Sequence, residues 1–157
     1  MFLILFESGQ FVASGMYHLA GSGLEGRPIQ ALCQVFRTDM SLRCEGTYAG
    51  AARHPFKMVI GFDELQLGGT FELRTPHTGD VKGSFGWSET GYDFAGWSTD
   101  RLGAVGLHLR QIKGSVFGLS GAVARDDKES LSFDVVLMPD DPLITKANVV
   151  AMAKRSA

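Results

Sequence analysis

The sequence has few of the features that mark membrane, nucleic-acid-binding or disulfide-rich proteins. None of its uninterrupted apolar runs approaches the ~20 residues that a transmembrane helix needs. The formal net charge is −2, and both signs are scattered along the chain, so no basic stripe is available to contact phosphates. We therefore expect no membrane span and no nucleic-acid partner.

Cysteine is scarce as well, with two residues in 157. The opening Met-Phe-Leu-Ile-Leu-Phe-Glu has no basic segment and no small-residue cleavage pattern, so we expect no signal peptide and a cytoplasmic protein. In that reducing compartment the thiols are expected to stay reduced. No histidine lies at ligand spacing from either cysteine, and we predict no metal site and no cofactor.

The two cysteines also indicate a strand register. An even-length loop centred on Thr38-Asp39 places Cys33 directly opposite Cys44. Both side chains then point to the apolar face, where a cross-strand disulfide is geometrically allowed.

Glycine and phenylalanine, in contrast, are abundant. The chain carries 20 glycines and 11 phenylalanines, while 45% of residues are apolar and 20% charged, as in an ordinary globular protein. Many glycines beside many bulky rings indicate tightly bent strands in which rings lie against bare backbone. With 157 residues and no linker or low-complexity segment, we expect one domain over residues 1–157.

Apolar and polar residues alternate with a period of two along almost the whole chain, as in half-buried strands. The runs recur at the spacing of roughly 8–12 residues that is typical of sandwiches and barrels. Connections this short favour neighbouring antiparallel strands over parallel crossovers. We predict an all-β fold, an antiparallel up-and-down β-barrel of about 8–10 strands, from runs in residues 2–7, 11–18, 29–35, 40–48, 56–62, 70–74, 81–87, 92–94, 105–110, 117–123 and 131–137.

The C-terminal segment breaks this alternation. Asp141 is a suitable N-cap and Pro142 a suitable first helical residue. An apolar stripe follows at helical spacing, and the last turn is basic, which suits the negative end of the helix dipole. We predict one α-helix over about residues 142–155, packed on the barrel through Leu143, Ala147, Val150 and Ala151.

Residues 86–98, GWSETGYDFAGWS, form the most aromatic stretch. A two-residue turn at Thr90-Gly91 places Trp87 opposite Phe94 and Phe85 opposite Gly96, where a ring covers exposed glycine backbone. Trp97 falls on the other face. Trp87 and Tyr92 then either fill a core or line a pocket, because barrels of about eight strands can do both.

The strand meander also resembles the calycin group of lipocalin-like and avidin-like barrels. The resemblance lies in Gly46-Thr47-Tyr48 followed by Ala51, and in Gly86-Trp87 further along the chain. It implies a barrel fold and no particular ligand.

Three functional hypotheses follow, of which the first is favoured. It is a small-molecule-binding barrel that takes an apolar or aromatic ligand in its interior, with Tyr48, Phe56, Met58, Trp87 and Tyr92 as candidate ligand-binding residues. Its basis is the inward aromatic and methionine set, together with the lack of a catalytic motif in the sequence.

The second hypothesis is a small barrel enzyme, such as an isomerase, cyclase or hydrolase. It would use a histidine paired with a carboxylate for acid–base work, with His54, Asp63 and His108 as candidates. Nothing in the linear spacing brings these residues together.

The third hypothesis is a filled-core scaffold that acts through its surface or a dimer interface. Its basis is the apolar residues expected on outward faces, which exceed what a monomer needs and indicate a homodimer. They are Leu3, Leu5, Leu32, Phe36, Val59 and Trp97.

Overall fold

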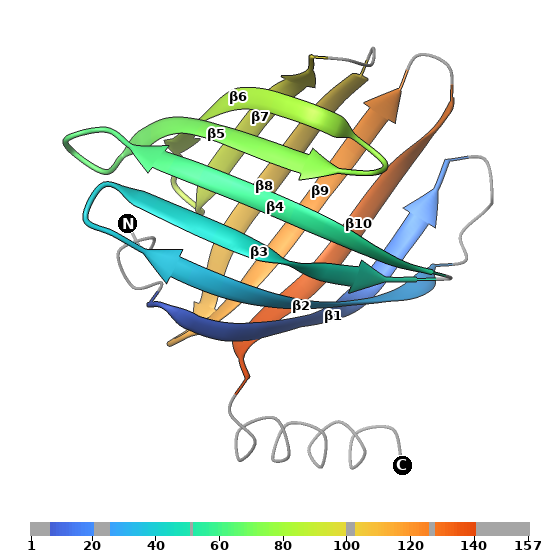
Figure 1. Cartoon of the computed structure of the whole chain (residues 1–157), viewed down its shortest axis with the longest axis horizontal. Helices are drawn as coiled ribbons and strands as arrows, with labels where there is room; N and C mark the ends of the chain where they lie inside the picture. The colour runs from blue at the N-terminus through green and yellow to red at the C-terminus, as the bar shows by residue number, and fades with distance from the viewer. Residues whose placement is uncertain (1–6, 21–25, 51, 100–102, 126–127, 141–157) are drawn as a thin grey trace.

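The chain forms a closed ten-stranded antiparallel β-barrel. The structure, a computed structural model, describes residues 7–20, 26–50, 52–99, 103–125 and 128–140. Consecutive strands pair throughout, and β1 pairs with β10 to close the sheet (Figure 1). The strands are β1 (Gly9–Leu19), β2 (Arg27–Arg37), β3 (Ser41–Ala49), β4 (Arg53–Phe62), β5 (Gly68–Thr75), β6 (Gly79–Trp87), β7 (Tyr92–Ser98), β8 (Gly103–Lys113), β9 (Val116–Arg125) and β10 (Lys128–Pro139).

This architecture confirms the predicted all-β antiparallel up-and-down barrel. The helix predicted over residues 142–155, with its cap at Asp141, lies outside the described residues, as do Leu3 and Leu5. Within the described ranges there is no helix long and apolar enough to cross a membrane.

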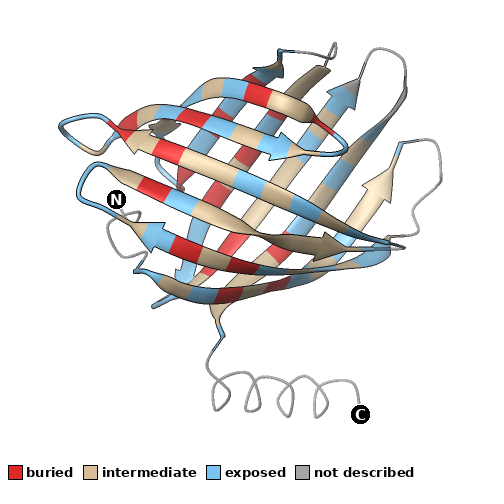
Figure 2. Ribbon diagram, in the orientation of Figure 1, coloured by how far each residue is buried: buried red, intermediate tan, exposed pale blue. Residues whose placement is uncertain are grey.

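More and less buried residues alternate along the strands, as expected when every second side chain points into the barrel (Figure 2). Buried side chains come from all ten strands, and most of them form one cluster around a group of aromatic rings. In that group Phe85 stacks on Phe94 with centroids 4.9 Å apart, and Phe71 meets Phe94 edge-on at 5.4 Å. Tyr92, Phe117 and Phe71 are at most 1% exposed.

Burial differs between the two ends of the barrel. The Tyr92 end, where the β4–β5, β6–β7 and β8–β9 turns lie, is packed. At the opposite end, which we call the Tyr48 end, the inward-facing side chains are only half-buried. Figure 2 shows buried bands giving way to partly exposed ones along β2, β3 and β4. The half-buried inward set comprises Tyr17, Ile29, Tyr48, His54, Phe56, Met58, Leu73, Thr75, Val123 and Phe133.

The predicted register between β6 and β7 is wrong by two residues. Trp87 pairs with Tyr92, and Phe85 with Phe94. The turn is centred on Glu89-Thr90, one residue earlier than predicted, and Ser88 N donates to Gly91 O at 2.7 Å across it. A ring does lie over Gly96, but it is Phe71, whose ring would come within 2.9 Å of any Cβ there. Because the shift is even, every side chain keeps its predicted face.

The register between β2 and β3 also differs by two residues from the prediction. Arg37 pairs with Leu42, and Thr38 N donates to Ser41 O at 2.9 Å, so this turn is centred on Asp39-Met40, one residue later than predicted. Cys33 therefore lies opposite Gly46, and Cys44 lies opposite Val35. The predicted direct pair is wrong, and the two cysteines are diagonal neighbours on the inner face.

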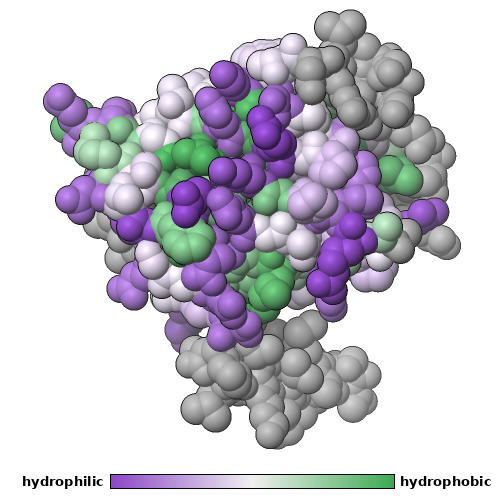
Figure 3. Space-filling model, in the orientation of Figure 1, coloured by the Kyte–Doolittle hydropathy of each residue, from purple (hydrophilic) through white to green (hydrophobic). Residues whose placement is uncertain are grey.

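The outer face carries some of the predicted apolar side chains. Trp97 is 65% exposed, and Leu32 and Phe36 are also exposed, while Val59 is half-buried. On the face that Figure 3 shows, hydrophobic side chains stand in separate groups among hydrophilic ones. A homodimer through these residues stays a prediction.

Replacing Phe71 by Ala tests the packing of the Tyr92 end. Its ring is 1% exposed, so the change should leave a void and lower the free energy of unfolding by roughly 3–5 kcal/mol. Chemical denaturation measures the loss. Leu65→Ala, at a side chain that is 73% exposed, is the control and should stay within about 0.5 kcal/mol. Equal midpoints for the two variants would contradict a packed end.

Candidate functional site

Polar and aromatic side chains converge at the Tyr48 end of the barrel. Tyr48 lies at the end of β3 and pairs with His54 at the start of β4, so both side chains point inward. His77, in the β5–β6 turn, reaches the same place, where the Tyr48 hydroxyl is hydrogen-bonded to its Nδ1 at 2.5 Å. The His54 and His77 rings meet edge-on with centroids 4.6 Å apart. Phe56 continues the cluster inward, 6.2 Å from Tyr48 between ring centroids.

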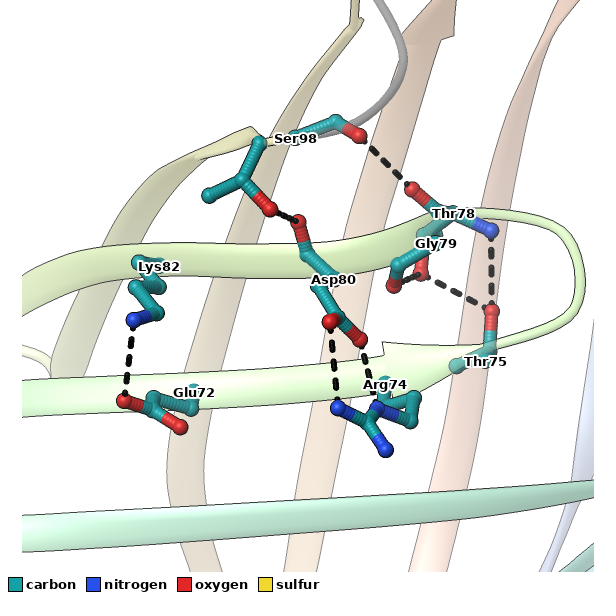
Figure 4. Close-up of polar contacts among 9 residues, drawn as sticks. Glu72, Arg74, Thr75, Thr78, Gly79, Asp80, Lys82 and Ser98 are labelled. Atoms are coloured by element: carbon teal, nitrogen blue, oxygen red, sulfur yellow. Dashed lines mark hydrogen bonds and ion pairs between the residues drawn. The ribbon is translucent and has the colours of Figure 1, made fainter.

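The turn that carries His77 is held by a network of hydrogen bonds (Figure 4). Thr75 and Thr78 bond to each other through their hydroxyls at 2.9 Å, and Thr78 N donates to Thr75 Oγ1 at 3.0 Å. Ser98 on β7 donates to the Thr78 carbonyl at 3.1 Å. Arg74 and Asp80 form a two-pronged ion pair across the base of the turn. These contacts fix His77 beside Tyr48 without a ligand.

The Tyr48 hydroxyl is kept in its neutral form. Partial burial raises the pKa of Tyr48 above its usual value, and a hydrogen bond with Thr75 only partly offsets this. A neutral phenol both donates and accepts a hydrogen bond. The cluster therefore offers one phenol and two imidazoles beside an apolar wall, an arrangement suited to a ligand with an apolar body and one polar group.

The other predicted ligand-binding residues fall at different places. Met58 faces inward next to Phe56 on β4 and is half-buried. Tyr92 is 0% exposed, and its hydroxyl donates to Gln66 O at 3.2 Å, so it packs the core of the opposite end. Trp87 is 37% exposed at the rim of that end, edge-on to Tyr92 with centroids 4.9 Å apart. Tyr48, Phe56 and Met58 thus share one site, separate from Trp87 and Tyr92.

The predicted pairing of His54 with Asp63 does not occur. The two residues lie at opposite ends of β4, and Asp63 Oδ1 instead accepts a hydrogen bond from Leu67 N at 3.1 Å. The ring next to His54 is that of His77, which was not among the predicted site residues. The sequence Thr-Pro-His-Thr-Gly indicates a turn at residues 75–79, but nothing in it indicates that the turn lies beside Tyr48.

His108 has a carboxylate partner that was not among the predicted site residues. Its Nδ1 lies 2.6 Å from Asp93 Oδ1, because β7 and β8 place the two residues opposite each other on the outer face. Thr90 Oγ1 lies 3.5 Å from the other ring nitrogen. This pair borders a groove on the outside of the barrel, away from Tyr48.

The cysteine pair forms a third polar contact inside the barrel. Both thiols are free. A hydrogen bond from Cys44 lowers the pKa of Cys33, against the opposing effect of burial. The same contact, together with burial and the neighbouring charges of Cys33 and Glu45, raises the pKa of Cys44 strongly. Cys33 is therefore the more acidic of the two thiols.

In the part of the chain that the structure describes, no three His, Cys, Asp or Glu side chains are grouped to hold a metal ion. The cluster at the Tyr48 end has only two imidazoles, those of His54 and His77, whereas a zinc site uses at least three protein ligands.

The fold is shared with a solved structure, that of the S-type phycobiliprotein lyase CPES from Guillardia theta. The two superpose with a TM-score of 0.62 at 12% sequence identity, over 85% of this chain and 88% of that chain. No protein-family model and no curated protein matches the sequence. The closed barrel and this likeness fit a calycin-like fold, and at this identity they establish the fold alone.

Replacing Cys44 by Ala tests the coupling of the two thiols. The change removes the hydrogen bond that lowers the pKa of Cys33 and leaves the burial that raises it, so Cys33 should ionise at higher pH. The pH dependence of its alkylation rate reports the shift. In the reciprocal variant Cys33→Ala, Cys44 should ionise at lower pH than in the wild type. An unchanged Cys33 profile would mean that the thiols do not interact.

Proposed function

We propose that this protein binds a small apolar or aromatic molecule inside the Tyr48 end of the barrel. The observation that carries the proposal is the uneven burial of the inward side chains. Tyr92 and Phe117 at the packed end are fully buried, whereas Tyr48, Phe56 and Met58 are only half-buried although they face the interior. Apolar groups that point inward and stay accessible are the usual lining of a ligand site.

The chemistry of these side chains matches such a ligand. The rings of Tyr48 and Phe56 present faces and edges against which a flat or aromatic molecule packs. Met58 adapts to an irregular shape because its side chain is unbranched and flexible. A ligand that loses about 200 Å² of apolar surface here gains roughly 5 kcal/mol from burial.

The polar groups of the cluster orient the ligand. Tyr48, His54 and His77 lie where the interior meets solvent, and the hydrogen-bonded turn holds His77 in place beforehand. A ligand whose apolar body enters first leaves its polar group beside the phenol and the imidazoles. Pre-organised groups lose little conformational freedom on binding, which favours affinity.

The shared fold with a phycobiliprotein lyase is consistent with a ligand-binding barrel. The proposal itself rests on the burial and contacts of this chain. An enzymatic role for the cluster lacks support, since His54 has an imidazole rather than a carboxylate as its neighbour.

Phe56→Ala tests the proposed site with a neutral fluorescent probe, N-phenyl-1-naphthylamine. Loss of one aromatic contact of about 1.5–3 kcal/mol should weaken probe binding roughly 10- to 100-fold. Lys57→Ala is the matched control, because Lys57 is the next residue of β4 and is exposed on the outer face. Fluorescence titration gives both dissociation constants, and thermal unfolding checks that both variants fold.

Two results would count against this site. The first is equal probe affinity in the Phe56→Ala and Lys57→Ala variants. The second is a larger loss in Trp87→Ala than in Phe56→Ala, which would place the ligand at the Tyr92 end.

A further inference from the structure

A groove of about 600 Å³ lies on the outside of the barrel, over β7 to β10 and the end of β1, where His18 lines it. Its polar border is a row of side chains in register on adjacent strands, in which Asp93 pairs with His108, His108 with Ser120, and Ser120 with Asp134. All four face outward, so this groove is separate from the interior site at Tyr48. Nothing in the proposed interior function uses it.

The groove is hollow because its floor has almost no side chains. Gly106 and Ala122 pair across β8 and β9 in the row next to the polar one. A Cβ at Gly106 would meet nothing closer than the Phe94 carbonyl oxygen, 4.0 Å away. The floor is therefore accessible to a ligand, and a larger side chain at residue 106 would occupy part of it.

The polar side chains along the groove determine which kind of ligand it can bind. Two carboxylates, Asp93 and Asp134, disfavour phosphates and other anions. Backbone groups of paired strands already bond to each other, so hydrogen bonds to a ligand must come from side chains. Carboxylates only accept, while serine hydroxyls and imidazoles also donate. This mixture suits a neutral ligand rich in hydroxyl groups and suits a purely apolar ligand poorly.

An exposed indole stands on the same face of β7. Trp97 lies four residues from Asp93, beyond the residues that line the groove, and is 65% exposed. It pairs with the small Ala104 on the side of β8, which faces the groove, and with Lys82 on the side of β6. The face of an indole ring is electron-rich and packs well against C–H groups that carry a partial positive charge. Sugar rings combine such C–H faces with hydroxyl edges.

We propose that the outer groove is a saccharide-binding site, with Trp97 as the stacking platform and the Asp93–His108 pair, Ser120 and Asp134 as hydrogen-bonding partners. Asp93 already accepts from His108 at 2.6 Å, which fixes both side chains before binding. The two carboxylates are three strands apart, about 14 Å at the usual strand spacing. Glycoside hydrolysis needs carboxylates within roughly 9.5 Å, so the site binds sugars and does not cleave them.

The test is an NMR titration of the protein with four neutral disaccharides: cellobiose, maltose, lactose and chitobiose. The chain has two tryptophans, so the Trp97→Phe variant identifies the two indole N–H signals. At least one sugar should shift the Trp97 signal in a saturable way and leave Trp87 unmoved. A phosphorylated sugar of the same size should bind more weakly, because the carboxylates repel it.

Gly106→Leu places a bulky side chain on the floor of the groove, opposite Ala95 and Ala122, and it should weaken sugar binding at least tenfold. Thr70→Leu adds the same side chain at an exposed outer position of β5 and should leave binding unchanged. Trp97→Ala should also weaken it. Failure of all four sugars to bind, unchanged binding in Gly106→Leu, or tighter binding of the phosphorylated sugar would each overturn the proposal. Probe binding at Phe56 is unaffected by any of these outcomes.

Discussion

The pairing of β1 with β10 is the contact on which the rest of the structure depends. It runs from Phe11 opposite Pro139 to Leu19 opposite Leu131 and converts an open meander into a closed barrel. Closure removes both free sheet edges, so the strand backbones are paired all round. Each strand then has one inner and one outer face, and the interior of ten strands is wider than that of eight. One candidate site lies in the interior and the other on the outer face.

A wide interior is either filled by side chains or left accessible. In this barrel the Tyr92 end is filled, and the Tyr48 end is accessible. Large rings fill the Tyr92 end, where Phe71, Phe85 and Phe94 contact one another. The opposite end has fewer buried rings, and its aromatic side chains are tied to polar partners, as Tyr48 is to His77. The packed end supplies stability, and the accessible end supplies a surface that water or a ligand must cover.

The face of each side chain could be predicted from the sequence, because alternation depends only on being in a strand. The pairing partners could not, because they depend on which two residues lie at the centre of each turn. These are Asp39-Met40 and Glu89-Thr90 rather than Thr38-Asp39 and Thr90-Gly91, and the first shift moved Cys44 away from Cys33. The Tyr48–His77 contact was not predictable from spacing, since it joins a strand end to a turn 29 residues away. The Asp93–His108 pair joins adjacent strands, and a known β7–β8 register would have revealed it.

The central claim is that the interior is accessible to a ligand at the Tyr48 end alone. Methyl NMR of the wild-type protein during titration with N-phenyl-1-naphthylamine tests it most directly. The account predicts that the methyl groups of Met58 and Leu73, which are half-buried, shift as the probe binds, while those of Leu42 and Leu109 at the Tyr92 end, at most 6% exposed, do not. Shifts confined to Leu42 and Leu109, or the absence of any interior shift at saturation, would contradict it.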